Sequence, residues 1–301
     1  MKPLDEQNLT LTPGEQECLE TIQEVCPDLE IQSVEAPGWS VRGNEVLLVN
    51  DQLVFRFPTQ QSGIATLRGE TRLLKSIQPY LSLPIPFPVY ENLGERRTGR
   101  AFASYQLIPG EPLWRELWFD LDRRVQNRLA HQAGQFLNEL HHIPLEAAPS
   151  ELAPQDGMHA WQETYAQVRQ ELFPRMRPDA RQEVSEHFEA FFGQAALQRF
   201  EPCLRHGDFG PSNILCELGP GSLSGVIDFS SAGLGDPARD VAAASLYGEA
   251  FLKAMAESYP ETSRLLERAR FYRGIFALEE ALTGVQDGDE SAIRRGLSKY
   301  T

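Results

Sequence analysis

The first third of the chain alternates hydrophobic and polar residues in short runs, the pattern of β-strands with one buried face. Asn50-Asp51 separates two of these runs and has the chemistry of a tight hairpin turn. A stretch at 67–81 instead repeats its apolar residues at helical spacing. The predicted strands span residues 31–34, 45–49, 53–57, 88–91 and 101–108.

Beyond Pro109-Gly110 the apolar residues recur at helical spacing. One β-like passage interrupts this pattern, because the runs 214–216 and 225–227 flank a Gly-Pro-Gly-Ser loop at 219–222 that is typical of a hairpin. The predicted helices of this region lie around 125–140, 184–195 and 265–282.

Together these elements predict an α+β protein in two parts. A small, antiparallel, β-rich lobe is expected at 1–108, and a larger, mainly helical lobe that carries one inserted hairpin at 109–301. Clefts between two such parts are favoured ligand sites.

Composition narrows the class of protein. The 28 basic and 43 acidic side chains give a formal charge of −15, which argues against nucleic acid as a partner. No apolar run approaches the ~20 residues that span a bilayer, and the first residues lack the pattern of a signal peptide. The four cysteines form no metal-type or disulfide pattern, so we expect reduced thiols in a cytoplasmic enzyme without a membrane partner.

Two carboxylates and an amide fall at the edges of the predicted hairpin. Asp208 and Asn213 lie in the H-G-D-F-G-P-S-N run at 206–213, and Asp228 follows the second strand. Folding of the hairpin should bring the three side chains to one end. Oxygen ligands of this kind suit Mg²⁺, which shares substrate phosphates. Phosphoryl transfer needs mainly positioning and charge neutralisation, so Asp208 is the expected partner of the attacking hydroxyl, with Asn213 and Asp228 holding the metal.

Two other interpretations of these residues exist. Asp and Asn are common in turns, so each residue could serve only the local backbone. His206 could instead belong to a zinc hydrolase with the aspartates as co-ligands, but no second histidine lies nearby to complete such a site.

A charged pair is predicted in the first lobe. Glu70 falls on the apolar stripe of the helix at 67–81, where an unpaired charge would be costly. Arg56 points to the same face of its strand as Val54. An ion pair between Arg56 and Glu70 would satisfy both side chains; the alternative is that Glu70 lies at the rim of the stripe, in water.

Two further motifs have mainly structural interpretations, and a third is a candidate for phosphate binding. Asp236 followed by Pro237 is a good helix start, and His141-His142 ends a helix where imidazolium complements the dipole. The Gly-containing segment 37–44, with Ser40 at its centre, could lay backbone N–H groups over phosphates.

These residues together resemble the aminoglycoside phosphotransferase family, a branch of the protein-kinase-like fold. The resemblance rests on H-G-D-x-x-x-x-N at 206–213, I-D-F at 227–229 and G-D-P-x-x-D at 235–240, and it extends from about residue 35 to about residue 289. Within the family, the chain is most similar to the enzymes that phosphorylate the 2″-hydroxyl of aminoglycosides.

The resemblance implies a two-lobed kinase-like fold with ATP or GTP in the cleft. Asp208 would be the catalytic aspartate and Asn213 and Asp228 the Mg²⁺ ligands, while Arg56 replaces the strand lysine that contacts the α- and β-phosphates and keeps its pairing to Glu70. Arginine preserves the charge of lysine but not its compact geometry. The remaining nucleotide contacts implied are Ser40, Tyr105 at the gate of the purine pocket, Gln106 and Ile108 in the hinge, and Leu215 and Ile227 on the floor.

The acceptor is expected to be a hydroxylated small molecule that could be cationic. Enzymes of the family line this pocket with carboxylates, for which Glu249, Glu279 and Glu280 are the candidates here, although Glu279 and Glu280 could equally be solvated residues. Alternatives are a kinase of another metabolite or antibiotic (an amino alcohol, a sugar derivative or a macrolide) and a nucleotide-binding protein without catalysis. The chain is expected to be a monomer or a homodimer.

Overall fold

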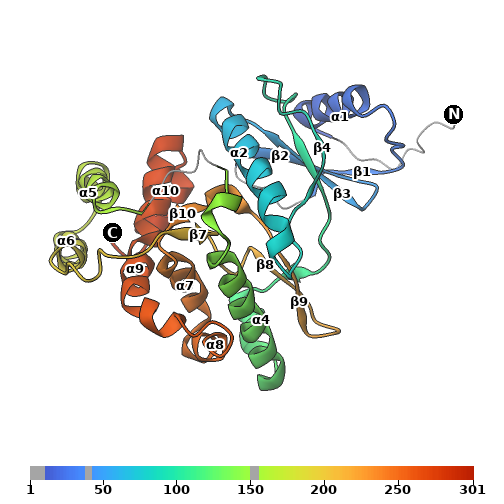
Figure 1. Cartoon of the computed structure of the whole chain (residues 1–301). Helices are drawn as coiled ribbons and strands as arrows, with labels where there is room; N and C mark the ends of the chain where they lie inside the picture. Colours follow the sequence, from blue (N-terminus) through green and yellow to red (C-terminus); the bar gives the residue numbers. More distant parts are fainter. Residues whose placement is uncertain (1–10, 38–42, 150–155) are drawn as a thin grey trace.

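The structure is a computed structural model that describes residues 11–37, 43–149 and 156–301 (Figure 1). Its N-terminal region is an antiparallel sheet of five strands in the order β1-β2-β3-β5-β4. The helical remainder of the chain lies against one end of this sheet, so the predicted α+β architecture is confirmed. The strands are β1 (Val34–Glu35), β2 (Asn44–Val49), β3 (Leu53–Pro58), β4 (Pro88–Glu91) and β5 (Ala103–Gln106).

The predicted hairpin turn between β2 and β3 is confirmed. The turn spans residues 50–52, because Val49 pairs with Leu53, and the Gln52 amide donates to the Val49 carbonyl at 3.1 Å. Asn50 and Asp51 have φ values of 56° and 53°, a left-handed conformation that Asn and Asp tolerate. The Asn50 side chain also accepts a hydrogen bond of 2.7 Å from the Gln32 amide. The turn therefore holds the segment before β1 against the hairpin.

Helix α1 (Pro13–Val25) was not among the predicted elements, and it covers the outer face of the sheet (Figure 1). It begins at a capping box in which Thr12 and Glu15 exchange hydrogen bonds. Its buried Ile22 belongs to a cluster that contains Phe55 and Phe102 of the sheet region. Burial of this apolar face, more than helix propensity, holds a helix of this length in place.

Helix α2 (Gln61–Ile77) lies on the other side of the sheet and carries Glu70. It begins at Gln61 rather than at the predicted Leu67, and the chain continues as a 3₁₀ turn at Gln78–Tyr80. The first turns have only one buried apolar residue, Ile64, which is why their helical periodicity is weak in the sequence.

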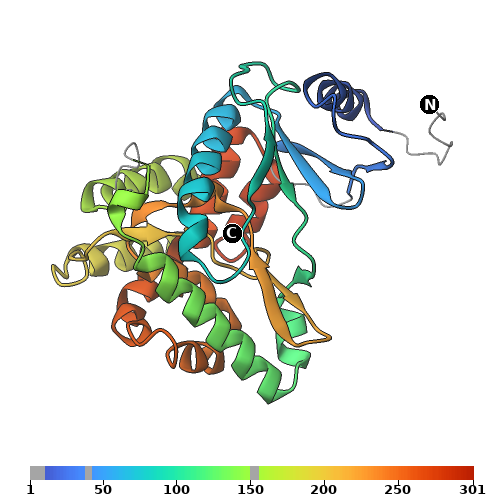
Figure 2. The same cartoon turned by 45° about the vertical axis from the view of Figure 1, so that its right-hand side comes forward.

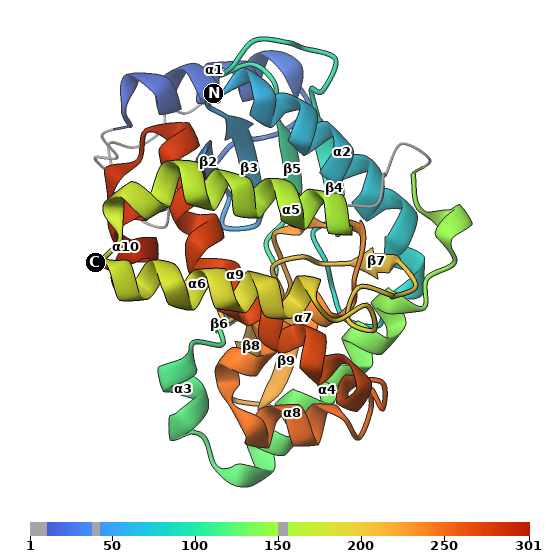
Figure 3. The ribbon, with the colours of Figure 1, turned by 90° about the vertical axis from the view of Figure 1, so that its left-hand side faces the viewer.

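The C-terminal region is mainly helical. The helices predicted around 125–140, 184–195 and 265–282 are confirmed as α4, α6 and α9. Helices α5 and α6 lie side by side (Figure 3), joined by Tyr165 and Phe188, whose rings stack with centroids 4.7 Å apart. The helices are α3 (Arg115–Asp120), α4 (Arg123–His141), α5 (Met158–Gln167), α6 (Pro178–Phe192), α7 (Ala238–Ala244), α8 (Glu249–Met255), α9 (Thr262–Asp287) and α10 (Glu290–Leu297).

Two small sheets join the two regions. The predicted hairpin is present as β8 (Ile214–Glu217) and β9 (Ser222–Val226), and β6 (Glu111–Pro112) pairs with β8 directly after the chain leaves the first sheet (Figure 2). The second sheet pairs β7 (Cys203–Arg205) with β10 (Gly233–Gly235).

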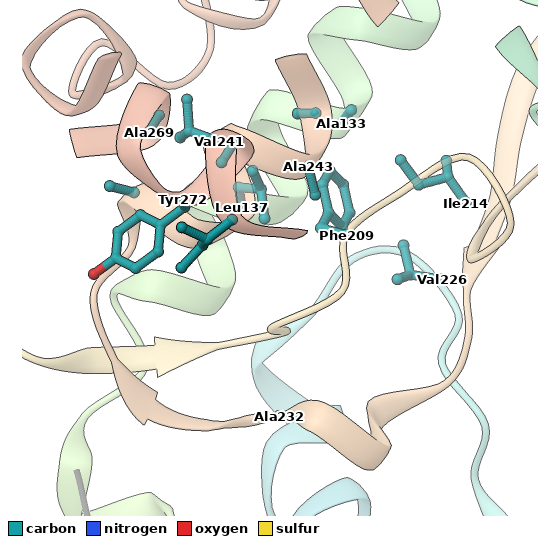
Figure 4. Close-up of a cluster of buried hydrophobic side chains, with 14 of the residues drawn as sticks. Ala133, Leu137, Phe209, Ile214, Val226, Ala232, Val241, Ala243, Ala269 and Tyr272 are labelled. Atoms are coloured by element: carbon teal, nitrogen blue, oxygen red, sulfur yellow. The ribbon is translucent and has the colours of Figure 1, made fainter. Parts of the chain in front are cut away.

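One continuous core underlies the helical region and reaches these small sheets. Phe209, fully buried, stacks on Phe136 of α4 with ring centroids 5.6 Å apart. Figure 4 shows Phe209 within this core together with Leu137 of α4 and Ala243 of α7. The loop that follows β7 is therefore anchored by a large buried side chain next to Asp208. Across the described residues, no helix is long and apolar enough to cross a membrane.

We expect Gly225→Ala to destabilise the protein by about 2 kcal/mol, because a methyl group there overpacks a filled site. A Cβ at this position of β9 would lie 2.7 Å from both Ile108 Cγ2 and the Pro84 carbonyl oxygen. Gly219→Ala, on the same hairpin, is the control, since no atom lies within 4 Å of its Cβ. Urea unfolding of both variants measures the effect; equal midpoints would contradict this packing.

Candidate active site

The loop between β7 and β8 presents Asp208 to solvent on a rigid backbone. Asp208 is exposed, whereas Gly207 and Phe209 on either side are buried. The Asn213 amide group closes the loop, because its Nδ2 donates to the Asp208 carbonyl at 2.8 Å and to the Asp208 carboxylate Oδ2 at 2.9 Å. The amide nitrogen of Asn213 thus fixes the orientation of the carboxylate.

Asp228 joins this pair at the same end of the β8–β9 hairpin. The Ile227 amide donates to the Asn213 carbonyl at 2.9 Å, which places Asp228 beside Asn213 in the chain path. Asp228 has φ 62°, an unusual conformation for a residue other than glycine, and its Oδ1 accepts from the Ser230 amide at 3.3 Å. The hairpin thus brings Asp228 to the end where Asp208 and Asn213 are bonded, and Asp208 and Asp228 line one cavity. A strained backbone at such a position is typical of functional sites.

His206 is a scaffold residue rather than a metal ligand. It is fully buried; its Nε2 lies 3.0 Å from the Ile227 carbonyl, and its Nδ1 lies 3.2 Å from the Asp208 amide. A carbonyl can only accept and an amide N–H can only donate, so Nε2 carries the proton and Nδ1 accepts. Both ring nitrogens are thereby used, which excludes the zinc interpretation.

Asp240 of α7 anchors the loop from behind, a role that sequence reasoning missed. Its Oδ1 accepts from the Gly207 amide at 2.7 Å, and its Oδ2 accepts from the His206 amide at 2.8 Å and from His141 Nε2 at 3.0 Å. Burial opposes the charge, but the hydrogen bond and charge of His141, with help from Arg205, lower the pKa of Asp240 to about 2. The G-D-P-x-x-D stretch at 235–240, which ends at Asp240, is the sequence signal that could have pointed to this role.

The neighbouring residues confirm the structural interpretations of two motifs. Asp236 lies one residue before Pro237, which is the N-cap of α7 in place of the predicted Asp236. Asp236 still supports the helix start, because it accepts a 2.9 Å bond from the Ala238 amide, and it also pairs with Arg268 at 2.7 Å. His141, at the end of α4, bonds Asp240 and the Tyr259 hydroxyl, so it lies in the same buried network. Gly207 has φ 85°, and a Cβ there would collide with the Ser231 carbonyl.

The predicted ion pair in the sheet region is confirmed. Arg56 Nη1 lies 2.9 Å from Glu70 Oε1, and both side chains are buried. Burial disfavours the charge of Arg56, yet the attraction of Glu70, together with Tyr105 and Asp228, raises its pKa. Burial raises the pKa of Glu70, and its own attraction to Arg56 opposes that shift. Because Asp228 acts on both groups, the pair lies within electrostatic reach of the Asp208–Asn213–Asp228 cluster.

A cavity of about 1070 Å³ contains these groups. Arg56 and Glu70 line it from the sheet side, and Asp208 and Asp228 from the helical side. The wall contributed by α9 is polar, with Glu279, Glu280, Thr283 and Asp287 beside Phe276. One cavity is therefore lined both by predicted phosphate-side residues and by two of the predicted acceptor residues.

The other predicted nucleotide contacts in the described part of the chain do not line the cavity. Tyr105 is buried on β5, Gln106 is exposed at the end of that strand, and Leu215 is buried on β8. Ile108 packs beside Gly225 of β9, and Ile227 precedes Asp228. Ser40 lies outside the described residues.

The expectation for Glu249 needs correction. The apolar stretch after Asp240 is not one helix: α7 ends at Ala244, and Gly248, with φ 96°, starts α8 in a new direction. Glu249 is consequently an exposed first residue of α8 and does not line the cavity. Glu279 and Glu280 do line it, each paired with an arginine: Arg239 at 2.9 Å and Arg295 at 2.8 Å.

The residues present fit a small hard cation. With Asn213 Nδ2 used by Asp208, the Asn213 amide oxygen and the Asp228 carboxylate remain as oxygen donors, which Mg²⁺ prefers. No group of three or more His, Cys, Asp or Glu side chains suited to a metal occurs in the described part of the chain. The donor set thus suits a partly hydrated ion shared with phosphates better than a closed protein site.

A sheet packed on a helical region, with a rigid aspartate loop facing a shared cavity, defines a kinase-like phosphotransferase. The family model described as "Phosphotransferase enzyme family" matches residues 36–272, and the chain belongs to this family. It is a small-molecule kinase, as the sequence predicted.

Individual relatives agree with the family. Viomycin phosphotransferase of Streptomyces vinaceus is 30% identical over 276 residues, which cover 88% of this chain and 94% of that protein. The wild-type aminoglycoside 2'-phosphotransferase-IIIa in its GDP complex is 27% identical with a TM-score of 0.86, over 95% of this chain and 97% of that one. The GDP and kanamycin complex of APH(2")-IIia is 28% identical with a TM-score of 0.84, over 93% and 95%. The resemblance to aminoglycoside phosphotransferases is confirmed.

We expect Asp240→Asn to lower the free energy of unfolding by about 3 kcal/mol, because the new NH₂ group would face a backbone N–H donor in a buried site. Asp179→Asn, at an exposed residue whose ion pair with Arg177 lies at the surface, is the control and should change little. Urea unfolding at pH 7 measures both. Equal stability of the two variants would show that the carboxylate does not hold the loop.

The same carboxylate predicts an acid limit to stability. Its pKa is about 2 in the folded protein against an ordinary value of 3.8. A lowered pKa contributes stability above pH 3.8 that is lost as the pH falls toward 2, here about 2 kcal/mol. The stability difference between wild type and Asp240→Asn should therefore narrow over that window; a constant difference would contradict the assignment.

Proposed function

We propose that the protein transfers the γ-phosphate of ATP or GTP to a hydroxyl group of a cationic small molecule, most closely an aminoglycoside or a similar antibiotic. The observation that carries the proposal is the position of Asp208. Its carboxylate is oriented by Asn213, and Asp208 lines the same cavity as Arg56 and Glu70. A positioned aspartate, oxygen donors for a metal and a basic side chain paired with a glutamate are the groups that phosphoryl transfer uses.

Each residue then has one task. Asp208 accepts the proton of the acceptor hydroxyl, which must lie within hydrogen-bond reach of the carboxylate. Asn213 and Asp228 would hold Mg²⁺, which neutralises phosphate charge when bound. Arg56, kept in place by Glu70, contributes positive charge toward the phosphates, and the hinge around Tyr105, Gln106 and Ile108 is assigned to the base, with Leu215 and Ile227 beneath it.

A cationic acceptor is supported by the α9 wall. Glu279, Glu280 and Asp287 contribute carboxylates to the cavity, within a chain of net charge −15. Of the relatives named above, one is a viomycin phosphotransferase and one binds kanamycin, which supports antibiotic acceptors without choosing between them. Cytoplasmic location, the monomeric or homodimeric state and the division at residues 108 and 109 stay predictions.

We expect Asp208→Asn to lower kcat at least ~1000-fold while leaving the nucleotide Kd within about twofold, because the amide can still accept from Asn213 but cannot take a proton. Single-turnover phosphate transfer and titration with a fluorescent nucleotide separate the two quantities. Transfer by the variant at near wild-type rate would refute the role of Asp208. Nucleotide binding by the wild type without transfer to any acceptor would instead favour a non-catalytic protein.

An acceptor panel tests the substrate class. Kanamycin, gentamicin, streptomycin, viomycin, a macrolide and an amino alcohol are assayed with ATP and GTP in parallel, by nucleoside diphosphate release. We expect the multiply charged amines to give the highest kcat/KM. Glu280→Gln should raise KM for them about fivefold, roughly 1 kcal/mol for a partly exposed charge contact, whereas Glu249→Gln should not. Highest activity toward an uncharged acceptor, with no effect of Glu280→Gln, would rule out the cationic class.

A further inference from the structure

Arg239 connects the α9 wall of the cavity to the loop between β7 and β8 through three hydrogen bonds. Its Nη1 and Nη2 donate to the two carboxylate oxygens of Glu279 at 3.1 and 2.9 Å. Its Nε donates to the Gly207 carbonyl at 3.3 Å. One guanidinium thus joins α9, at the acceptor side of the cavity, to the peptide that directly precedes Asp208.

Aromatic rings hold this guanidinium in a defined place. Its central carbon lies 5.9 Å from the centre of the Trp161 ring, 6.0 Å from that of Tyr272 and 5.6 Å from that of Phe276. Such stacking suits the flat, weakly hydrated arginine head and not the ammonium of lysine. The side chain is therefore preorganised before any acceptor arrives.

The position of Arg239 differs from that of the residues around it. Asp236 and Asp240 are fully buried and hold the start of α7 and the back of the loop. Arg239, by contrast, lines the cavity together with Gly207, Asp208 and Glu279. A purely structural residue of this segment would have no reason to face the cavity between the wall and the loop.

The bidentate bond leaves Glu279 able to bind an acceptor. A carboxylate offers about four lone-pair positions, of which Arg239 occupies two, so an ammonium or hydroxyl of the acceptor can still bind the same oxygens. The Arg239 side chain would then hold a group bound to Glu279 at a fixed position relative to the Gly207 peptide.

We propose that Arg239 is a positioning residue for transfer: it fixes the Gly207 peptide, and with it the Asp208 carboxylate, at a set distance from an acceptor held by Glu279. The proposal rests on the proposed phosphotransferase function. It assigns Arg239 no contact with the reacting atoms.

The first test needs no activity. Hydrogen exchange of the full-length wild type is compared with Arg239→Met, which keeps an apolar stem among the rings but removes the three donors, and with Arg239→Lys. Arg270→Met, at an exposed arginine of α9 outside the cavity, is the control. We expect amides of the 206–213 loop to exchange at least tenfold faster in Arg239→Met, less so in Arg239→Lys, and unchanged in Arg270→Met. Unchanged loop exchange, or faster exchange spread evenly over the helical region, would overturn the proposal.

The second test separates positioning from binding, using an acceptor that the wild type phosphorylates. Arg239→Met should lower kcat at least thirtyfold with the nucleotide KM unchanged, and Arg239→Lys should recover part of the loss. Glu279→Gln should mainly raise the acceptor KM, since its amide oxygen still accepts from Arg239. A kcat unaffected in Arg239→Met sinks the proposal. A wild type inactive toward every acceptor would instead refute the proposed function, and loop exchange would still decide whether Arg239 holds the loop.

Discussion

The site depends on one buried carboxylate. Asp240 accepts hydrogen bonds from the amides of His206 and Gly207 and from the ring of His141. A buried charge that would be costly without partners therefore holds the loop in place. Because the backbone is held from behind by this anion and by the buried Phe209, Asp208 can remain exposed to the cavity and still keep one orientation. Preorganisation of the loop is thus provided by groups that never meet the substrate.

The spacing of the H-G-D-x-x-x-x-N run follows from the same packing. His206 must reach the Ile227 carbonyl, and Gly207 must leave room for the Ser231 carbonyl at positive φ. Asn213 must come back to the Asp208 carbonyl across a turn closed by the bond from its own amide to the Gly210 carbonyl. His206, Gly207 and Asn213 therefore each meet a different geometric requirement of the loop that joins β7 to the β8–β9 hairpin.

Sequence patterns predicted the parts of the molecule that local chemistry determines. The Asn50-Asp51 turn, the Arg56–Glu70 pair and the grouping of Asp208 with Asn213 and Asp228 each follow from a rule about turns, buried charge or hairpin geometry. Helix α1 was not predicted although Thr12 and Glu15 form a capping box. Its apolar face is buried only by packing against the sheet, which local sequence does not reveal. Similarly, the break at Gly248 that exposes Glu249 depends on tertiary packing that no window of sequence contains.

The sheet side and the α9 side of the cavity carry different charged groups, and this difference affects how two substrates would share the cavity. The sheet side offers Arg56, whose charge is kept by Glu70, whereas the α9 side offers Glu279 and Glu280, each balanced by an arginine. Each of these charges is already paired, so under the proposed function the difference lies in the groups that each side offers. The guanidinium N–H donors of the first side suit phosphates, and the carboxylate oxygens of the second suit the ammonium and hydroxyl groups of a cationic acceptor. The two ligands would therefore take one relative orientation in the cavity that Asp208 also lines. That orientation would come from fixed hydrogen-bond donors and acceptors. An unpaired buried charge would not be needed, and it would lower the stability of the protein.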